Sequence, residues 1–171
     1  KYDIPPERID VGYNVGDSSF FLHTVRRFEV DREVLRQREA LPEPLLLFVG
    51  NLTKGKNVQG LLKACRRLDA QLEFPIGLMI VGDGPLRSFL EAEAISLQNV
   101  QVTFTGFLQG DALARCFALA DIFVLPTYYD SASIALGEAL HSGLFVIASS
   151  GDGSTGNFVR PGTNGYVVDP N

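Results

Sequence analysis

Long apolar runs and basic runs are both missing from this chain of 171 residues. No apolar stretch approaches the roughly 18 residues of a transmembrane helix, and no signal peptide is found. The net charge is −5, which argues against nucleic acid or an anionic membrane surface as the main partner. We therefore expect a cytoplasmic protein, in which any phosphate site is a local exception to an acidic surface.

Cysteine and histidine are scarce. The two cysteines, Cys65 and Cys116, fall inside predicted helices, which favours isolated buried thiols; a disulfide is the alternative. His23 and His141 are far apart in sequence, and His141 is expected to cap the end of a helix rather than to act in catalysis. No Cys/His/Asp cluster has metal-ligand spacing, and no D-x-D motif, G-x-S-x-G elbow or P-loop occurs. The sequence therefore predicts neither a metal nor a resident cofactor.

Apolar residues are plentiful, at 46% of the chain, and charged residues are interspersed among them. This composition predicts a folded protein with one domain and a proper core. The chain begins at a lysine in polar sequence, as expected of an excised domain spanning residues 1–171.

The segment Asp121–Ala148 predicts the repeating unit of a parallel α/β sheet. An apolar run, Ile122–Leu125, is followed by a small polar loop, Thr127–Ser133. Apolar residues then recur at helical spacing from Ile134, and a second apolar run covers Leu144–Ala148. Gly143 stands where a helix C′ residue is expected. The order is therefore strand, loop, helix, strand.

The rest of the chain repeats this pattern. Further strands are predicted at Leu45–Val49, Ile76–Val81, Val100–Phe104 and Tyr166–Val168, with helices between them. We therefore expect an α/β fold, a Rossmann-like parallel sheet of about six strands with helices on both faces, over residues 45–171. Residues 1–41 are interpreted as a linker and a peripheral helix: a short strand at Ile9–Val11, and a solvated helix over Arg26–Leu41 with Val30, Val34 and Leu35 at helical spacing.

Two acids and a helix start lie together in the central unit. Asp130 precedes the predicted helix, Glu138 lies eight residues further on, and small residues, Ser131–Ser133, stand between the loop and the helix. The first turn of a helix offers unpaired N–H groups to an anion. Acids beside such a site accept hydrogen bonds from hydroxyl groups. Phosphate together with a polyol is the chemistry of a nucleotide sugar.

A second candidate phosphate site follows Leu45–Val49. A glycine and a basic loop, Gly50–Lys56, lead into the next predicted helix. The alternative is that Lys54 and Lys56 are ordinary exposed loop lysines. Gly82 and Gly84 do not form a dinucleotide fingerprint, because the third glycine is missing, and we interpret them as tight-turn residues. Lys56, Gly82, Phe107 and Asp130 each follow a predicted strand, which places all four at the carboxyl edge of the sheet.

Six motifs in order resemble one family. Asp130 and Glu138 match its acid-x7-Glu unit, and Gly50 to Lys56 matches G-R-L-x-x-x-K, with Asn51 in place of the Arg. The other matches are V-G-x-G-P at Val81–Pro85, F-x-G-F at Phe104–Phe107, G-x-N-G-Y-V-V-D-P at Gly162–Pro170 and a linker at Asn14–Asp17. The chain resembles the donor-binding, C-terminal domain of retaining glycosyltransferases of the GT-B fold, the glycosyl transferases group 1 family, over Asn14–Asn171.

The resemblance implies a role for each matched residue. Lys56, with Asn51, would hold the donor diphosphate and stabilise it as leaving group, assisted by the backbone N–H groups of Ser133 and Ile134. Asp130 would bind sugar hydroxyls and Glu138 the ribose hydroxyls. The nucleotide would also be bound by four further residues: Gly50, Gly82, Phe107 and Leu108. For Phe107, core packing is the alternative.

The implied reaction moves a sugar from a nucleoside-diphosphate sugar to an acceptor hydroxyl with retention and without a metal. An N-terminal acceptor domain, absent from this chain, would complete the enzyme and carry any membrane association. We therefore expect this chain to bind nucleotide but to transfer almost nothing. Two alternatives remain: a non-catalytic nucleotide- or sugar-binding module, and a GT-B-fold sugar-nucleotide epimerase. The acid-x7-Glu unit favours a transferase.

Overall fold

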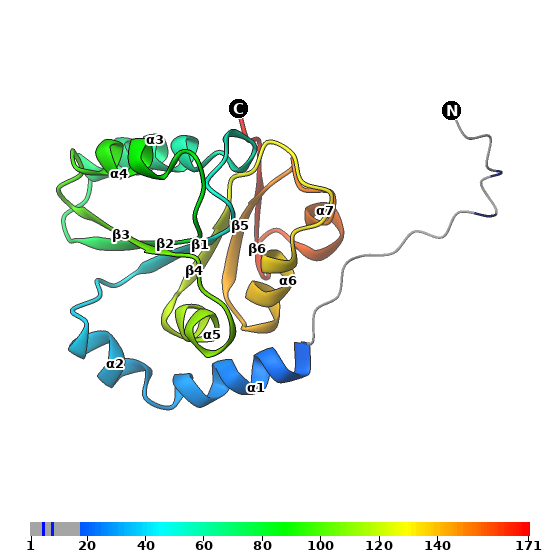
Figure 1. Ribbon diagram of the computed structural model, residues 1–171, viewed down its shortest axis with the longest axis horizontal. Coiled ribbons are helices and arrows are strands. Elements are labelled where there is room, and N and C mark those ends of the chain that lie inside the picture. The colour runs from blue at the N-terminus through cyan, green and yellow to red at the C-terminus, as the bar shows by residue number, and fades with distance from the viewer. Residues whose placement is uncertain (1–4, 6–7, 9–17) are drawn as a thin grey trace.

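The computed structural model describes residues 5, 8 and 18–171, and residues 18–171 form one parallel α/β sheet with its helices (Figure 1). The six strands are β1 (Leu45–Val49), β2 (Ile76–Val81), β3 (Val100–Gly106), β4 (Ile122–Leu125), β5 (Phe145–Ser149) and β6 (Gly165–Val168). The α-helices are α1 (Ser18–Glu29), α2 (Arg32–Arg38), α3 (Val58–Asp69), α4 (Arg87–Ala94), α5 (Gly110–Leu119), α6 (Ile134–His141) and α7 (Thr155–Phe158), and a 3₁₀ turn, η2, covers Lys54–Lys56.

The sheet has the strand order β3-β2-β1-β4-β5-β6, and every neighbouring pair is parallel. The predicted Rossmann-like α/β fold of about six strands is thus confirmed, and each predicted strand differs from the observed one by no more than two residues at either end. The order reverses between β1 and β4, because the chain runs outward from β1 to β3 and then returns to the other side of β1. In open α/β sheets, ligands bind outside the carboxyl ends of the strands at such a reversal.

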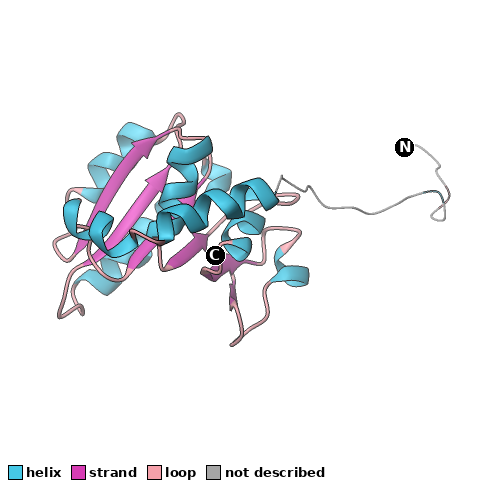
Figure 2. Ribbon diagram, turned by 90° about the horizontal axis from the view of Figure 1, so that it is seen from below, coloured by secondary structure: helices cyan, strands magenta, loops and turns pink. Residues whose placement is uncertain are grey.

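Helices cover both faces of the sheet. In Figure 1, α3 and α4 lie above it and α1, α2 and α5 lie below; Figure 2, the view from below, shows helices crossing in front of the strands. Two clusters of buried apolar side chains correspond to the two faces. One is built around Leu47, Phe117 and Phe123, and the other around Phe48, Leu62 and Ile80. Successive residues Leu47 and Phe48 of β1 thus point to opposite sides of the sheet.

The structure corrects the prediction of a solvated helix over residues 26–41. Two helices, α1 and α2, stand there, and α1 packs against α5 through a T-shaped contact between Phe21 and Phe117, with ring centroids 5.2 Å apart. Of the three apolar residues chosen from helical spacing, only Leu35 packs against the core. Val30 is 83% exposed and Val34 66% exposed, whereas Val25 is buried. The segment breaks into two helices between Glu29 and Arg32, so one helical period does not run through it and the predicted buried face is not the observed one.

One acidic residue, here called the anchor, fixes helix α2 to the amino edge of the sheet. Asp121, just before β4, accepts hydrogen bonds from the Leu45 N–H at 2.7 Å, from the buried Arg36 guanidinium at 3.0 Å, and from Arg32. Burial acts to raise the pKa of Asp121, but the Leu45 N–H and the two guanidinium groups outweigh it and hold that pKa below the ordinary aspartate value. Asp121 therefore joins α2, the start of β1 and the start of β4.

The predicted strand at Ile9–Val11 and the predicted linker at Asn14–Asp17 lie outside the described residues. Within the described part of the chain, no helix combines the length and the apolarity needed to cross a membrane.

Cys65 in α3 and Cys116 in α5 are both buried and free, as predicted, and burial raises the pKa of each thiol to about 11.

Replacing the anchor should destabilise the protein. We expect Asp121→Asn to lower the free energy of unfolding by about 2 to 4 kcal/mol, because it leaves the buried Arg36 guanidinium without its counter-ion. Chemical denaturation measures this loss. Since the folded-state pKa of Asp121 lies below its unfolded value, the loss should be full near neutral pH and shrink as the pH falls through the acid range.

The matched control is Asp111→Asn, which removes an acid of the same kind from an exposed ion pair with Arg27. Exposed pairs contribute at most about 1 kcal/mol. Equal losses for the two variants would show that Asp121 is not a special anchor.

Candidate functional site

Two loops meet at the carboxyl edge of the sheet where the strand order reverses. The loop after β1 contains η2, and the loop after β4 is Pro126–Ser133. The Tyr128 N–H and the Thr127 hydroxyl both donate to the Gly55 carbonyl, each at 2.8 Å. Figure 1 shows both loops close to the C-terminus. These hydrogen bonds join the two segments that sequence analysis selected as phosphate and polyol sites.

Asn57 ties the same loops together and was missed by the sequence analysis. It adopts a left-handed conformation, with φ +53°, and its side-chain oxygen accepts from the Gly60 N–H at 3.1 Å, which caps α3. Its amide nitrogen donates to the carbonyls of Pro126, at 3.0 Å, and Pro170, at 3.1 Å. An asparagine three residues before a glycine at a helix start was the available signal, since asparagine is a favoured N-cap.

Lys56 and Asp130 come together across these loops. The Lys56 ammonium donates to Asp130 Oδ2 in an ion pair, with side chains 21% and 20% exposed respectively. The Lys56 stem lies along Gly50, where an added Cβ would stand 3.7 Å from Lys56 Cε. Three residues predicted for the site, Gly50, Lys56 and Asp130, are therefore neighbours, and the alternative of an ordinary exposed loop lysine does not hold for Lys56. Lys54 is exposed.

The glycines after the strands permit close contact of three chain segments. Gly82, with φ +135°, faces the Gly50 carbonyl so closely that a Cβ there would overlap it. The Gly82 N–H donates to the Gly106 carbonyl at 2.8 Å. The interpretation of Gly82 as a tight-turn residue is supported by this geometry. Asn51, beside Gly50, is exposed, and its side chain makes no hydrogen bond within the described part of the chain.

Phe107 and Leu108 follow β3 at the same edge. Phe107 is 70% exposed, so the alternative that it packs in the core is wrong. Leu108 is half-buried and packs against the cluster around Phe117. The Gly106 carbonyl accepts a hydrogen bond from the Gly82 N–H, and Phe107 is the residue directly after Gly106. Among the described residues, no hydrogen bond or ring contact joins Phe107 to the ion pair of Lys56 and Asp130.

The start of α6 differs from the prediction. The Ser133 N–H donates at 2.8 Å to Asp152 Oδ2, so this amide is already paired and the prediction that it contacts phosphate is wrong for this arrangement. Asp152 is buried, and its other oxygen accepts from the Ser154 N–H at 2.9 Å. An acid at a helix N-terminus is favoured by the helix dipole. Ile134, the next residue, is 50% exposed.

The glycine-rich loop after β5 fixes the backbone of Asp130. The Asp130 N–H donates to the Gly151 carbonyl at 3.0 Å, and the Gly153 N–H donates to the Asp130 carbonyl at 2.9 Å. A Cβ at Gly151 or Gly153 would overlap carbonyls of the loop after β4. The glycines of this loop were the usable sequence signal for close backbone approach.

Glu138 lies in α6 and, within the described part of the chain, makes no hydrogen bond or ion pair with Lys56 or Asp130. It is half-buried, and burial raises the pKa of its carboxyl above the ordinary glutamate value. Among the described residues, no hydrogen bond or ion pair to its side chain offsets this burial. His141 hydrogen-bonds through Nδ1 to the Gly137 carbonyl at 2.7 Å, which agrees with its predicted capping role. Gly143, with φ +74°, ends the helix as predicted.

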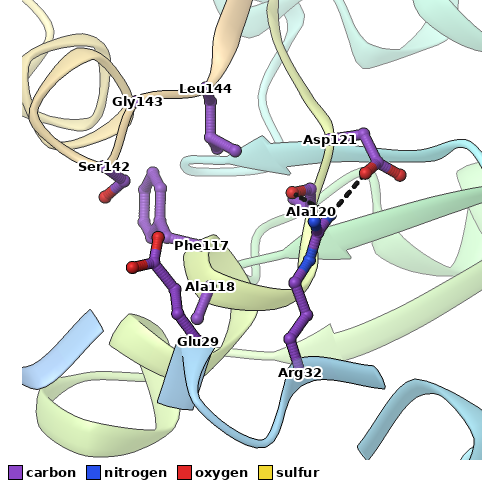
Figure 3. Close-up of a pocket in the computed structure, with 9 residues that line it drawn as sticks. All are labelled: Glu29, Arg32, Phe117, Ala118, Ala120, Asp121, Ser142, Gly143 and Leu144. Carbon is purple, nitrogen blue, oxygen red and sulfur yellow. Dashed lines mark hydrogen bonds and ion pairs between the residues drawn. The ribbon is translucent and has the colours of Figure 1, made fainter. Parts of the chain in front are cut away.

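A separate pocket lies on the opposite edge of the sheet (Figure 3). Its volume is about 400 Å³, within the range of small-molecule sites. Arg32 and Asp121 pair on one side, and Glu29 points toward Phe117 and Ser142 on the other. No residue predicted for the functional site lines it.

Within the described ranges, no group of three or more His, Cys, Asp or Glu side chains is placed to hold a metal ion.

Comparisons with known proteins agree with this fold. Residues 31–171 match the sequence model of the family described as Glycosyl transferases group 1. One relative, the GDP-mannose-dependent alpha-mannosyltransferase of Mycolicibacterium smegmatis, is 36% identical over 128 residues, which cover 74% of this chain and 30% of the relative. The chain spans about a third of the length of the curated relatives it matches, from 24% to 43% for three others.

Two solved structures show the same architecture. WaaG, a glycosyltransferase involved in lipopolysaccharide biosynthesis, has a TM-score of 0.76 at 27% identity and covers 98% of this chain, which matches 45% of WaaG. Anabaena HepE in complex with UDP has a TM-score of 0.74 at 20% identity, over 97% of this chain and 45% of HepE, which shows a shared fold.

Replacing Glu138 tests the burial of its carboxyl. We expect Glu138→Gln to raise the free energy of unfolding near pH 7, because the buried carboxylate no longer has to lose its hydration. The folded-state pKa is raised, so the native carboxyl is favoured when protonated and loses stability as the pH rises. The gain should therefore vanish at about pH 3, where the wild-type carboxyl is protonated in both states.

Denaturation curves at the two pH values measure the difference. Glu33→Gln, at an exposed position in α2, serves as the matched control and should change little at either pH. A loss of stability in Glu138→Gln near pH 7 would contradict the prediction and would indicate a favourable partner for the carboxylate.

Proposed function

The chain belongs to the glycosyl transferases group 1 family, and on this premise we propose that it forms the donor-binding part of an enzyme that moves a sugar from a nucleoside-diphosphate sugar to an acceptor hydroxyl. The observation that carries the proposal is the meeting of Lys56 and Asp130 at the reversal of the sheet. A cation suited to phosphate and an acid suited to hydroxyls stand within hydrogen-bond reach of each other.

Lys56 is proposed to bind the diphosphate. Its cation would stabilise the negative charge that develops on the leaving nucleoside diphosphate. Asn51, exposed beside Gly50, would donate a hydrogen bond without adding charge. Of the two amides predicted to assist, only that of Ile134 stays in the proposal, because the Ser133 N–H is bound to Asp152.

The polyol and the base are assigned to other residues. Asp130 would accept hydrogen bonds from hydroxyls of the transferred sugar and Glu138 from those of the ribose. Gly50 and Gly82, which carry no side chain, would let the nucleotide approach the backbone at this edge of the sheet. The exposed ring of Phe107, with Leu108 beside it, would lie against the base.

The whole enzyme is proposed to work with retention at the anomeric carbon and without a metal. Acceptor contacts would come from an N-terminal domain of the same protein, outside this chain. The named dependence of the mannosyltransferase relative on GDP-mannose supports a nucleotide sugar as donor. A cytoplasmic location is proposed, in keeping with two free buried cysteines.

A non-catalytic nucleotide- or sugar-binding module is the second candidate. It is favoured by the uncharged Asn51 at the position where the family pattern has arginine, because an amide supplies neither the charge nor the bidentate fork of a guanidinium.

Calorimetry with UDP, GDP and ADP and with their glucose or mannose conjugates tests the binding site. We expect one nucleoside diphosphate to bind best and Lys56→Ala to weaken it about 10- to 100-fold, the usual loss of a charge-assisted hydrogen bond. Lys63→Ala, at an exposed position in α3, is the matched control and should leave affinity unchanged. Equal effects of the two variants would refute the assignment of Lys56.

Turnover separates the two candidate functions. We expect the 171-residue chain to bind its donor without transferring sugar, and the full-length protein to transfer it, because acceptor contacts lie outside this chain. Chromatography of radiolabelled donor and product measures both. Transfer by the short chain would show that no further domain is needed, and donor binding without transfer by the full-length protein across a broad acceptor panel would favour the non-catalytic module.

A further inference from the structure

We propose that Asp130 and the donor diphosphate compete for Lys56, so that an incoming donor exchanges its phosphates for the Asp130 carboxylate and thereby frees that carboxylate for the sugar. This inference rests on the proposed function and concerns the same site. It makes the ion pair of Lys56 and Asp130 one of two alternative states.

The two backbones that carry the pair are both fixed. Lys56 ends η2 directly before Asn57, whose side chain is held by three hydrogen bonds. Asp130 is held by main-chain bonds to Gly151 and Gly153. An exchange of partners therefore needs only side-chain rotation. Both side chains are about one-fifth exposed, so each can reach a ligand at the surface.

The local charges favour the exchange. Bound to each other, Lys56 and Asp130 present no net charge to an approaching diphosphate, and the carboxylate repels it. Two acids in neighbouring loops already have partners. Asp83 pairs with Arg87, and Asp152 is bound by Ser133 and Ser154. Asn51 adds no charge, so the diphosphate gains the Lys56 cation only by drawing it away from Asp130; the exposed Lys54 in the same turn is the other cation of this loop.

The exchange has different consequences for the donor and for the spent nucleoside diphosphate. An intact sugar nucleotide replaces the lost cation of Asp130 with sugar hydroxyls, which donate to the freed carboxylate. A nucleoside diphosphate without sugar gives Asp130 no such replacement. The ion pair would therefore favour binding of the donor over binding of its nucleotide product. Its re-formation would also help to release that product.

Replacing Asp130 by asparagine separates these effects. The amide keeps the size of the side chain and the main-chain bonds but cannot form the ion pair. We expect Asp130→Asn to bind the best nucleoside diphosphate of the calorimetric panel about three- to tenfold more tightly than wild type, the size of a typical coupling between neighbouring charges. The preference for the corresponding sugar nucleotide over the nucleoside diphosphate should fall by a similar factor.

Asp111→Asn is the matched control. It changes the net charge by the same amount, but Asp111 is exposed and pairs with Arg27 in α1 rather than with Lys56, so this variant should leave both affinities unchanged. In a Lys56→Ala background the tightening by Asp130→Asn should disappear, because no lysine is left to release. Circular dichroism melting curves confirm that each variant is folded.

The outcomes distinguish the inference from the function on which it rests. If no nucleoside diphosphate binds to folded wild-type chain, the donor site and the exchange both fail. If one binds and Lys56→Ala weakens it, but Asp130→Asn leaves its affinity unchanged or lowers it, the donor site stands and the exchange is refuted. Equal tightening by Asp111→Asn would also refute it, because net charge alone would then explain the effect.

Discussion

The hydrogen bonds between the loop after β1 and the loop after β4 hold the candidate site together. They exist because the parallel sheet reverses its strand order between these two strands, so that consecutive crossovers leave in opposite directions and their loops face each other. Gly55 accepts from both Thr127 and Tyr128, and Asn57 adds a bond to Pro126. With the two loops joined in this way, Lys56 and Asp130 are brought into contact from positions 74 residues apart.

A third loop completes the arrangement. The chain after β5 reaches back to the loop after β4 through Gly151 and Gly153, and it delivers Asp152 to the start of α6. The site is thus assembled from the ends of three strands, β1, β4 and β5, while β2 and β3 contribute the glycines that pack behind it. Each contribution depends on backbone atoms lying closer together than side chains would permit, which explains the concentration of glycine at this edge.

The sheet could be predicted from the sequence because buried parallel strands are continuous apolar runs. Leu45–Val49 and Ile76–Val81 have no other plausible place than a core covered on both sides. Lys56 and Asp130 could be selected because each follows such a run. Helix α1 could not be placed, because its buried face depends on contact with α5, and periodicity read across the break at residues 30–31 pointed to Val30 and Val34 instead.

Polar side chains that act through distant partners were also beyond sequence reasoning. Asp152 lies in a glycine-rich loop, and nothing in the local pattern indicates that its carboxylate reaches Ser133, 19 residues earlier in the chain. Asn57 has a local cap signal, but its bonds to Pro126 and Pro170 arise only when the sheet forms. Positions with no room for a Cβ could be inferred from glycine, but the hydrogen-bond partners of a buried carboxylate or amide could not.

The buried carboxylate of Asp152 affects how an anion reaches this edge. Its negative charge offsets the positive N-terminal end of the α6 dipole from inside the protein, so that the helix attracts an anion in solution only weakly. The chain as a whole carries a net charge of −5. A phosphate approaching from solution therefore travels against the long-range field and gains attraction only at short range. Dissolved salt shortens the reach of that field, to about 8 Å at physiological ionic strength, and so eases the encounter before contact is made.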